Sequence, residues 1–154
     1  MISLLESASV SAIFQIPQVA GYRFETAPDL ADPATRRKLS PAAVKGFFRI
    51  VAAWRVRDED ARQLLGGISS GSFYSLKRNP RSLDHDTLTR VSLMVGIFKA
   101  LHTLYSIKLA DAWITLPNTN PMFHGATPLA YMLRLGVPGM MHVRELLDAR
   151  SAGQ

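Results

Sequence analysis

The sequence contains no cysteine among its 154 residues, and this absence excludes several kinds of site. Without thiols there is no disulfide framework, no cysteine nucleophile and no thiolate metal ligand. The four histidines, at positions 85, 102, 124 and 142, do not have the compact spacing of zinc ligands, so no metal site is predicted. The chain is nevertheless 47% hydrophobic and long enough to bury a core without such cross-links.

Long apolar runs and nucleotide-binding motifs are missing as well. No segment approaches the roughly 20 apolar residues that cross a bilayer. The first 14 residues have no basic flank and include Glu6, which argues against a signal peptide. The chain also lacks a phosphate loop and a dinucleotide-binding glycine motif. Its acidic clusters, at 58–60 and at 84 and 86, fall at expected helix starts. We therefore expect a cytoplasmic protein with no membrane segment, no cofactor and no catalytic residues.

Positive charge is present in excess, and it is concentrated in the middle of the chain. The formal net charge is +6. Residues 1–40 carry four bases and four acids, residues 41–100 carry ten bases and five acids, and residues 101–154 carry four bases and three acids. A basic segment of this kind is typical of a domain that neutralises phosphates, although a solvated helical surface has the same composition.

Hydrophobic spacing predicts an all-α chain of about seven or eight helices. Ser40-Pro41 has the form of a helix cap followed by proline, and Thr127-Pro128 repeats that form. Asp84 opens the longest periodic segment, and Pro138 opens the last helix. Residues 1–40 show no sustained period and are interpreted as an unassigned N-terminal arm.

The segment 58–78 has the layout of a helix-turn-helix. Gly66-Gly67 supplies the turn, Ala61 is the candidate small residue at the helix crossing, and Ile68 follows the turn. The second helix of such a unit lies in the major groove, and its flanking bases contact phosphates. The residues predicted to bind DNA are Ser69, Ser70, Ser72, Tyr74, Ser75, Lys77, Arg78 and Arg81. Lys45, Arg49, Arg55 and Arg57 add to the same positive field.

The second glycine leaves two readings of the turn open. If Gly66 is the turn residue, then Arg62 rather than Ala61 occupies the position where a small residue is needed. The turn is then wider and the second helix is aimed differently. A helix-turn-helix that serves only as helical packing is the alternative to DNA binding.

The second half of the chain resembles the Xre/MbcA/ParS family of antitoxins. The resemblance rests on Trp113, Pro117-Asn118 and the run from Phe123 through Gly125 to Thr127-Pro128-Leu129. The string Leu64 to Ser69 is also similar to the first module of that family. This resemblance implies an Xre-like helix-turn-helix domain at 41–82 and a toxin-binding domain at 83–150.

The resemblance also implies a function and partners. Such proteins neutralise a toxin, commonly of the NAD-consuming RES type, by occluding its active site, and they often repress their own operon. A homodimer on operator DNA, within a toxin–antitoxin hetero-oligomer, is expected. A basic group on the last helix would suit a toxin pocket that binds pyrophosphate. The residues expected to contact the toxin are Asn118, Asn120, Met122, Phe123, His124, Arg144 and Arg150.

Two other functions remain open at this level. The chain fits a stand-alone transcriptional regulator whose C-terminal domain only dimerises. It also fits a protein-binding adaptor whose helix-turn-helix has lost DNA binding. The product of the adjacent gene, and its toxicity when expressed alone, separates these possibilities from an antitoxin.

Overall fold

The computed structural model of the chain describes residues 28–153, and all the elements assigned there are helices. This part holds seven α-helices and two 3-10 helices, with no strand, which confirms the all-α prediction. Most of the predicted N-terminal arm, residues 1–27, lies outside the described residues. In chain order the elements are α2 (Pro33–Ala53), α3 (Asp58–Leu64), α4 (Ser70–Arg78), α5 (His85–Leu104), α6 (Ile107–Ala112), η2 (Trp113–Thr115), η3 (Pro121–Phe123), α7 (Pro128–Leu135) and α8 (Val137–Ala152).

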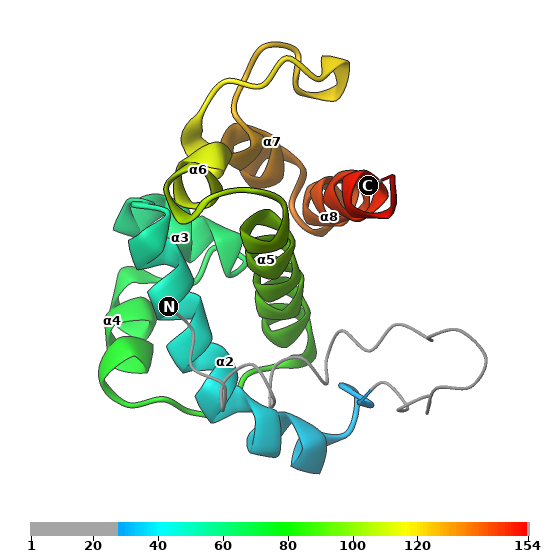
Figure 1. Cartoon of the computed structure of the whole chain (residues 1–154). Helices are drawn as coiled ribbons and strands as arrows, with labels where there is room; N and C mark the ends of the chain where they lie inside the picture. The colour runs from blue at the N-terminus through cyan, green and yellow to red at the C-terminus, as the bar shows by residue number, and fades with distance from the viewer. Residues whose placement is uncertain (1–27, 154) are drawn as a thin grey trace, which may run out of the picture.

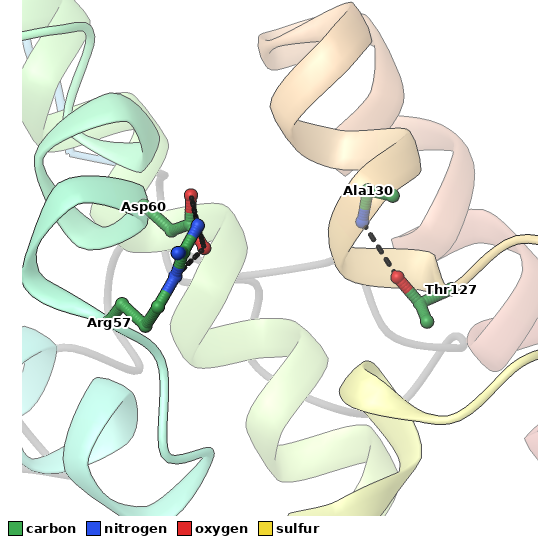
Figure 2. Close-up of polar contacts among 4 residues, drawn as sticks. All are labelled: Arg57, Asp60, Thr127 and Ala130. Atoms are coloured by element: carbon green, nitrogen blue, oxygen red, sulfur yellow. Dashed lines mark hydrogen bonds and ion pairs between the residues drawn. The ribbon is translucent and has the colours of Figure 1, made fainter.

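Side-chain caps begin most of these helices. Each cap accepts a hydrogen bond from a backbone N–H of the first turn, which has no partner inside the helix. The Thr127 hydroxyl accepts from the Ala130 amide at 3.0 Å at the start of α7 (Figure 2), and Asp84 accepts from Thr87 at 2.7 Å at the start of α5. The predicted cap-plus-proline start at Thr127-Pro128 is confirmed.

The first described helix begins earlier than the sequence pattern predicted. Helix α2 starts at Pro33, is capped by Asp32, and contains Pro41 in its interior, so the predicted start at Ser40-Pro41 is wrong. Ser40 is fully buried, and its hydroxyl accepts a hydrogen bond from the Leu83 amide at 2.8 Å. That hydroxyl joins α2 to the segment before α5, which is a tertiary role that a cap signal does not reveal. With 21 residues, α2 is also longer than the 20-residue α5.

Helix α5 is the centre of the fold. It packs between α2 on one side and α8 on the other, while α7 lies against α8 (Figure 1). Its buried positions occur at nearly every turn on more than one face, as expected for a helix covered on two sides. The buried side chains form one continuous core from Leu39 on α2 to Leu147 on α8.

Replacing the cap of this central helix should cost measurable stability. The Thr87 backbone N–H and then its hydroxyl stabilise the ionised carboxylate, so the pKa of Asp84 lies below its ordinary value. A lowered pKa in the folded state contributes stability above the unfolded pKa and loses it as pH falls through the folded pKa. We expect Asp84→Ala to lower the unfolding free energy by about 1 kcal/mol at pH 7, measured by urea denaturation.

Asp84→Asn is the matched control, because asparagine also accepts the cap hydrogen bond. At pH 7 it should recover only part of the stability lost in Asp84→Ala, because it keeps the acceptor but lacks the charge. The difference between the wild type and Asp84→Ala should shrink below about pH 3, where carboxylates become protonated. An Asp84→Ala deficit that is the same at both pH values would contradict this role of the charge.

Candidate functional site

The two glycines between α3 and α4 both belong to the turn. Gly66 and Gly67 have φ values of 101° and 82°, in the left-handed region that favours glycine. Ala61 is fully buried, whereas Arg62 is partly exposed and its Nε donates to the Ile68 carbonyl at 3.1 Å. Ala61 therefore occupies the buried small-residue position, and Arg62 stabilises the turn through its hydrogen bond to Ile68.

The residues predicted to bind DNA lie along one side of α4 and its flanks. Six of them, Ser69, Ser70, Tyr74, Lys77, Arg78 and Arg81, are exposed, while Ser72 and Ser75 are partly buried. The Ser69 hydroxyl accepts from the Ser72 amide at 3.1 Å and is the cap of α4. Phe73 and Leu76 occupy the opposite, buried side of the helix. Exposed serine, tyrosine and basic side chains on one helix face are the groups that a major-groove reading helix presents.

The start of α3 brings acidic groups close to this face. The Tyr74 hydroxyl donates to Asp58 Oδ2 at 2.8 Å, and this bond together with the negative charge raises the pKa of Tyr74. Arg57 and Asp60 form an ion pair at 3.3 Å, shown in Figure 2. The first turn of α3 therefore carries three carboxylates. Asp60 is paired with Arg57, and Asp58 accepts a hydrogen bond from Tyr74 of α4.

The loop between η2 and α7 projects beyond the helical body (Figure 1) and is ordered by its own asparagines. Asn118 Oδ1 accepts from the Asn120 amide at 2.9 Å, and Asn120 Oδ1 accepts from the Met122 amide at 3.0 Å. The Asn118 amide donates to the Ala126 carbonyl at 3.1 Å, which closes the base of the loop. The carboxamide oxygens thus shape the loop. Side chains that turn their own backbone in this way are typical of tight loops.

The tip of this loop is anchored from inside by an aromatic side chain. Phe123 is 2% exposed, and its ring meets Trp113 and Tyr131 edge-on at centroid distances of 6.2 and 5.2 Å. His124 follows it with φ of 50° and is exposed, while Met122 is partly buried. Phe123 therefore supports the loop from the core, and His124 is the neighbouring side chain that lies on the surface.

Arg150, near the end of α8, lies at the base of the same loop. Its Nη1 donates to the Tyr105 hydroxyl at 2.9 Å. Together with Asn118 it lines a hollow of about 260 Å³, whose other walls are Trp113, Leu116, Pro117 and Thr119. The fold thus brings together two predicted site residues that are 32 positions apart in sequence, and it holds the guanidinium in place through a tyrosine.

Arg144 lies elsewhere on α8, so the structure does not bring it to this hollow. Its Nε contacts both carboxylate oxygens of Asp148 at 3.0–3.1 Å. Burial, and then the nearby charge of Arg144, lowers the pKa of Lys99 on α5. Six residues at 100° each place Arg144 and Arg150 on different faces of a helix. The predicted contact residues therefore form one group around the loop and Arg150, with Arg144 apart from it.

The sequence pattern alone did not identify several residues around the hollow. Tyr105, Leu116 and Thr119 were missed because none belongs to a recognisable motif. Leu116 and Leu109 are 45% and 40% exposed, which is unusual for leucine. Leu109 lies in α6, and Leu116 is the extended residue that directly follows η2. Exposed leucines this close in the sequence are the signal that would have indicated an apolar contact surface.

Two absences among the described residues are relevant to the class of site. Over residues 28–153, no helix combines the length and apolar character needed to cross a membrane. The same part of the chain holds no group of three or more His, Cys, Asp or Glu side chains that fits a metal ion.

Comparison with known proteins identifies the last third of the chain. Residues 105–153 match the antitoxin Xre/MbcA/ParS C-terminal toxin-binding domain, a range that includes the loop, its aromatic anchor and Arg150. The chain is also 36% identical over 124 residues to the uncharacterized protein y4oB of Sinorhizobium fredii (strain NBRC 101917 / NGR234), covering 80% of this chain and 95% of that protein. No solved structure matches it. This part of the chain belongs to the Xre/MbcA/ParS antitoxin family, as its C-terminal toxin-binding domain.

Proposed function

We propose that this antitoxin neutralises a toxin of the RES type by covering the entrance to its NAD-consuming active site. The covering surface consists of the loop at 116–127 and the end of α8 around Arg150. The observation that carries this proposal is the hollow in which Arg150 and Asn118 lie together, inside the range that matches a toxin-binding domain.

The chemistry of this surface suits a protein partner. Arg150 is partly exposed and held by Tyr105, so little side-chain entropy is lost when its guanidinium binds an acceptor. Leu116 and Pro117 supply exposed apolar area beside it. An arginine anchor surrounded by apolar contacts is the usual composition of an energetically dominant patch in a protein interface.

Co-expression with the product of the adjacent gene tests the neutralisation. That product alone should stop growth, and co-expression with this chain should restore growth and yield a complex that co-purifies. A RES-type toxin should lower cellular NAD when expressed alone, and the antitoxin should prevent that loss. A neighbour that is harmless when expressed alone would overturn the proposal, and a toxic neighbour that spares NAD would overturn the RES assignment.

We further propose that α4 binds operator DNA as part of a homodimer and that the protein represses its own operon. The support is the glycine turn, the buried Ala61 and the exposed polar and basic face of α4. Binding to the promoter fragment should weaken linearly in log–log coordinates as salt rises, because each phosphate contact releases condensed counterions. A promoter fragment that is not shifted at low salt, with or without the toxin, would reject operator binding.

A further inference from the structure

Charge is distributed unevenly around the helix-turn-helix. In such units the first helix crosses the DNA backbone, and a helix N-terminus is a natural place for a phosphate. Here the first turn of α3 carries Asp58, Glu59 and Asp60, which place negative charge where that phosphate would bind. The usual backbone contact is therefore electrostatically unfavourable at the start of α3.

The other side of α4 carries the opposite charge. A groove of about 520 Å³ lies between α2 and the end of α4, with Lys45, Arg49 and Lys77 among its lining residues. Among the described residues that line it, none is acidic. Lys45 and Arg49 are exposed and one helical turn apart on the same face of α2. Val44, Phe48 and Ala52 form an apolar floor between the bases.

The groove is structurally continuous with α4. Phe48 of α2 packs edge-on against Phe73 of α4 at a centroid distance of 5.3 Å. The Lys77 ammonium lies 5.8 Å from the centroid of the Phe48 ring, which orients this base beside the floor. A DNA duplex that received α4 in its major groove would therefore have its flanking sugar–phosphate backbone next to Lys45, Arg49 and Lys77.

We infer that this groove, and not the start of α3, holds the sugar–phosphate backbone of the bound duplex. The inference rests on the operator binding proposed above. Lys45, Arg49 and Lys77 contact phosphates, and the apolar floor lies against deoxyribose. An acidic peptide matches the same charges, but the groove adjoins the exposed face of α4 through Phe48 and Lys77, which favours the duplex.

The salt dependence of duplex binding tests this placement. Each phosphate contact contributes about 0.9 to the slope of log K against log salt, so Lys45→Gln/Arg49→Gln should lower the slope by about 1.8. If the wild type and the double variant have equal duplex affinities near 1 M salt, this slope difference makes the double variant bind roughly 60-fold more weakly at 0.1 M salt. The measurement is fluorescence anisotropy with a promoter duplex and with an unrelated duplex, and both should lose affinity alike.

Two control variants locate the contact. Lys38→Gln removes an exposed charge on the same helix outside the groove and should leave the slope within error of the wild type. Glu59→Gln removes an exposed charge at the start of α3 and should change the affinity less than twofold if no phosphate lies there. Circular dichroism and thermal unfolding confirm that each variant is folded.

The outcomes separate this inference from the proposals on which it rests. A double variant with an unchanged slope, while the wild type binds normally, overturns the groove and leaves operator binding standing. A double variant that loses the toxin complex but keeps the slope also overturns it and assigns the groove to an acidic protein. A wild type that binds no duplex overturns both operator binding and the groove, while toxin neutralisation is judged separately by growth.

Discussion

Arg150→Glu should abolish neutralisation of the toxin while leaving operator binding intact. Arg150 is fixed by Tyr105 beside Asn118, in the range that matches the toxin-binding domain. Truncation of an interfacial arginine anchor costs about 2 kcal/mol or more, which is about 30-fold in Kd. Reversal of its charge adds repulsion from whatever acceptor it meets. We expect growth rescue to be lost and the affinity, measured by calorimetry with the purified toxin, to fall at least that far.

Lys38→Glu is the matched control, because it makes the same charge change on the exposed surface of α2, outside residues 105–153. It should rescue growth like the wild type. Arg144→Ala tests the residue that the structure separates from the hollow and should weaken the complex much less than Arg150→Glu. Full growth rescue by Arg150→Glu would show that Arg150 lies outside the toxin interface. A larger loss of toxin affinity with Arg144→Ala than with Arg150→Glu would show that the interface lies on the other face of α8.

Phe123→Ala should cause the largest loss of stability among the loop residues. Phe123 is 2% exposed and packs between Trp113 and Tyr131, so its removal leaves a cavity beneath the loop. Substitutions of buried phenylalanine by alanine cost about 3–5 kcal/mol. Urea denaturation should show this loss. Toxin affinity should also fall, because a loop without its anchor must be ordered again on binding.

Phe123→Leu distinguishes support of the loop from direct contact with the toxin. Leucine retains most of the buried apolar volume. We therefore expect Phe123→Leu to lose less than about half of the stability that Phe123→Ala loses, and to keep most of the toxin affinity. If Phe123→Ala keeps its stability yet loses the toxin, the ring contacts the partner and does not act as an anchor. The sequence prediction that Phe123 contacts the toxin would then be confirmed.

Local signals in the sequence were sufficient for most of the helices. Thr127-Pro128 and Asp84 begin helices as predicted, because a cap and a proline act within one turn and need no tertiary partner. The same signal at Ser40-Pro41 was misleading, since Asp32-Pro33 offers an equivalent cap eight residues earlier. Packing selected the earlier start and used the Ser40 hydroxyl to bind the Leu83 amide.

The candidate site was predictable only in part. The exposed face of α4 follows from helical periodicity, because buried and exposed positions alternate with the turn of the helix. Periodicity does not reveal that the Tyr74 hydroxyl is bonded to Asp58, or that the Phe123 ring points inward. Both features depend on the position of another helix that packs nearby, and the spacing of residues within one helix does not predict that position.

By itself, then, the sequence determined the all-α class, the glycine turn and the family, because these depend on short-range periodicity, backbone freedom and motif. Tertiary structure alone decided which predicted residues meet. It placed Arg150 beside Asn118 and against the Tyr105 hydroxyl, and it separated the basic groove of α2 from the acidic start of α3. The physical reason is that contacts between distant residues are set by how apolar helix faces pack around α5.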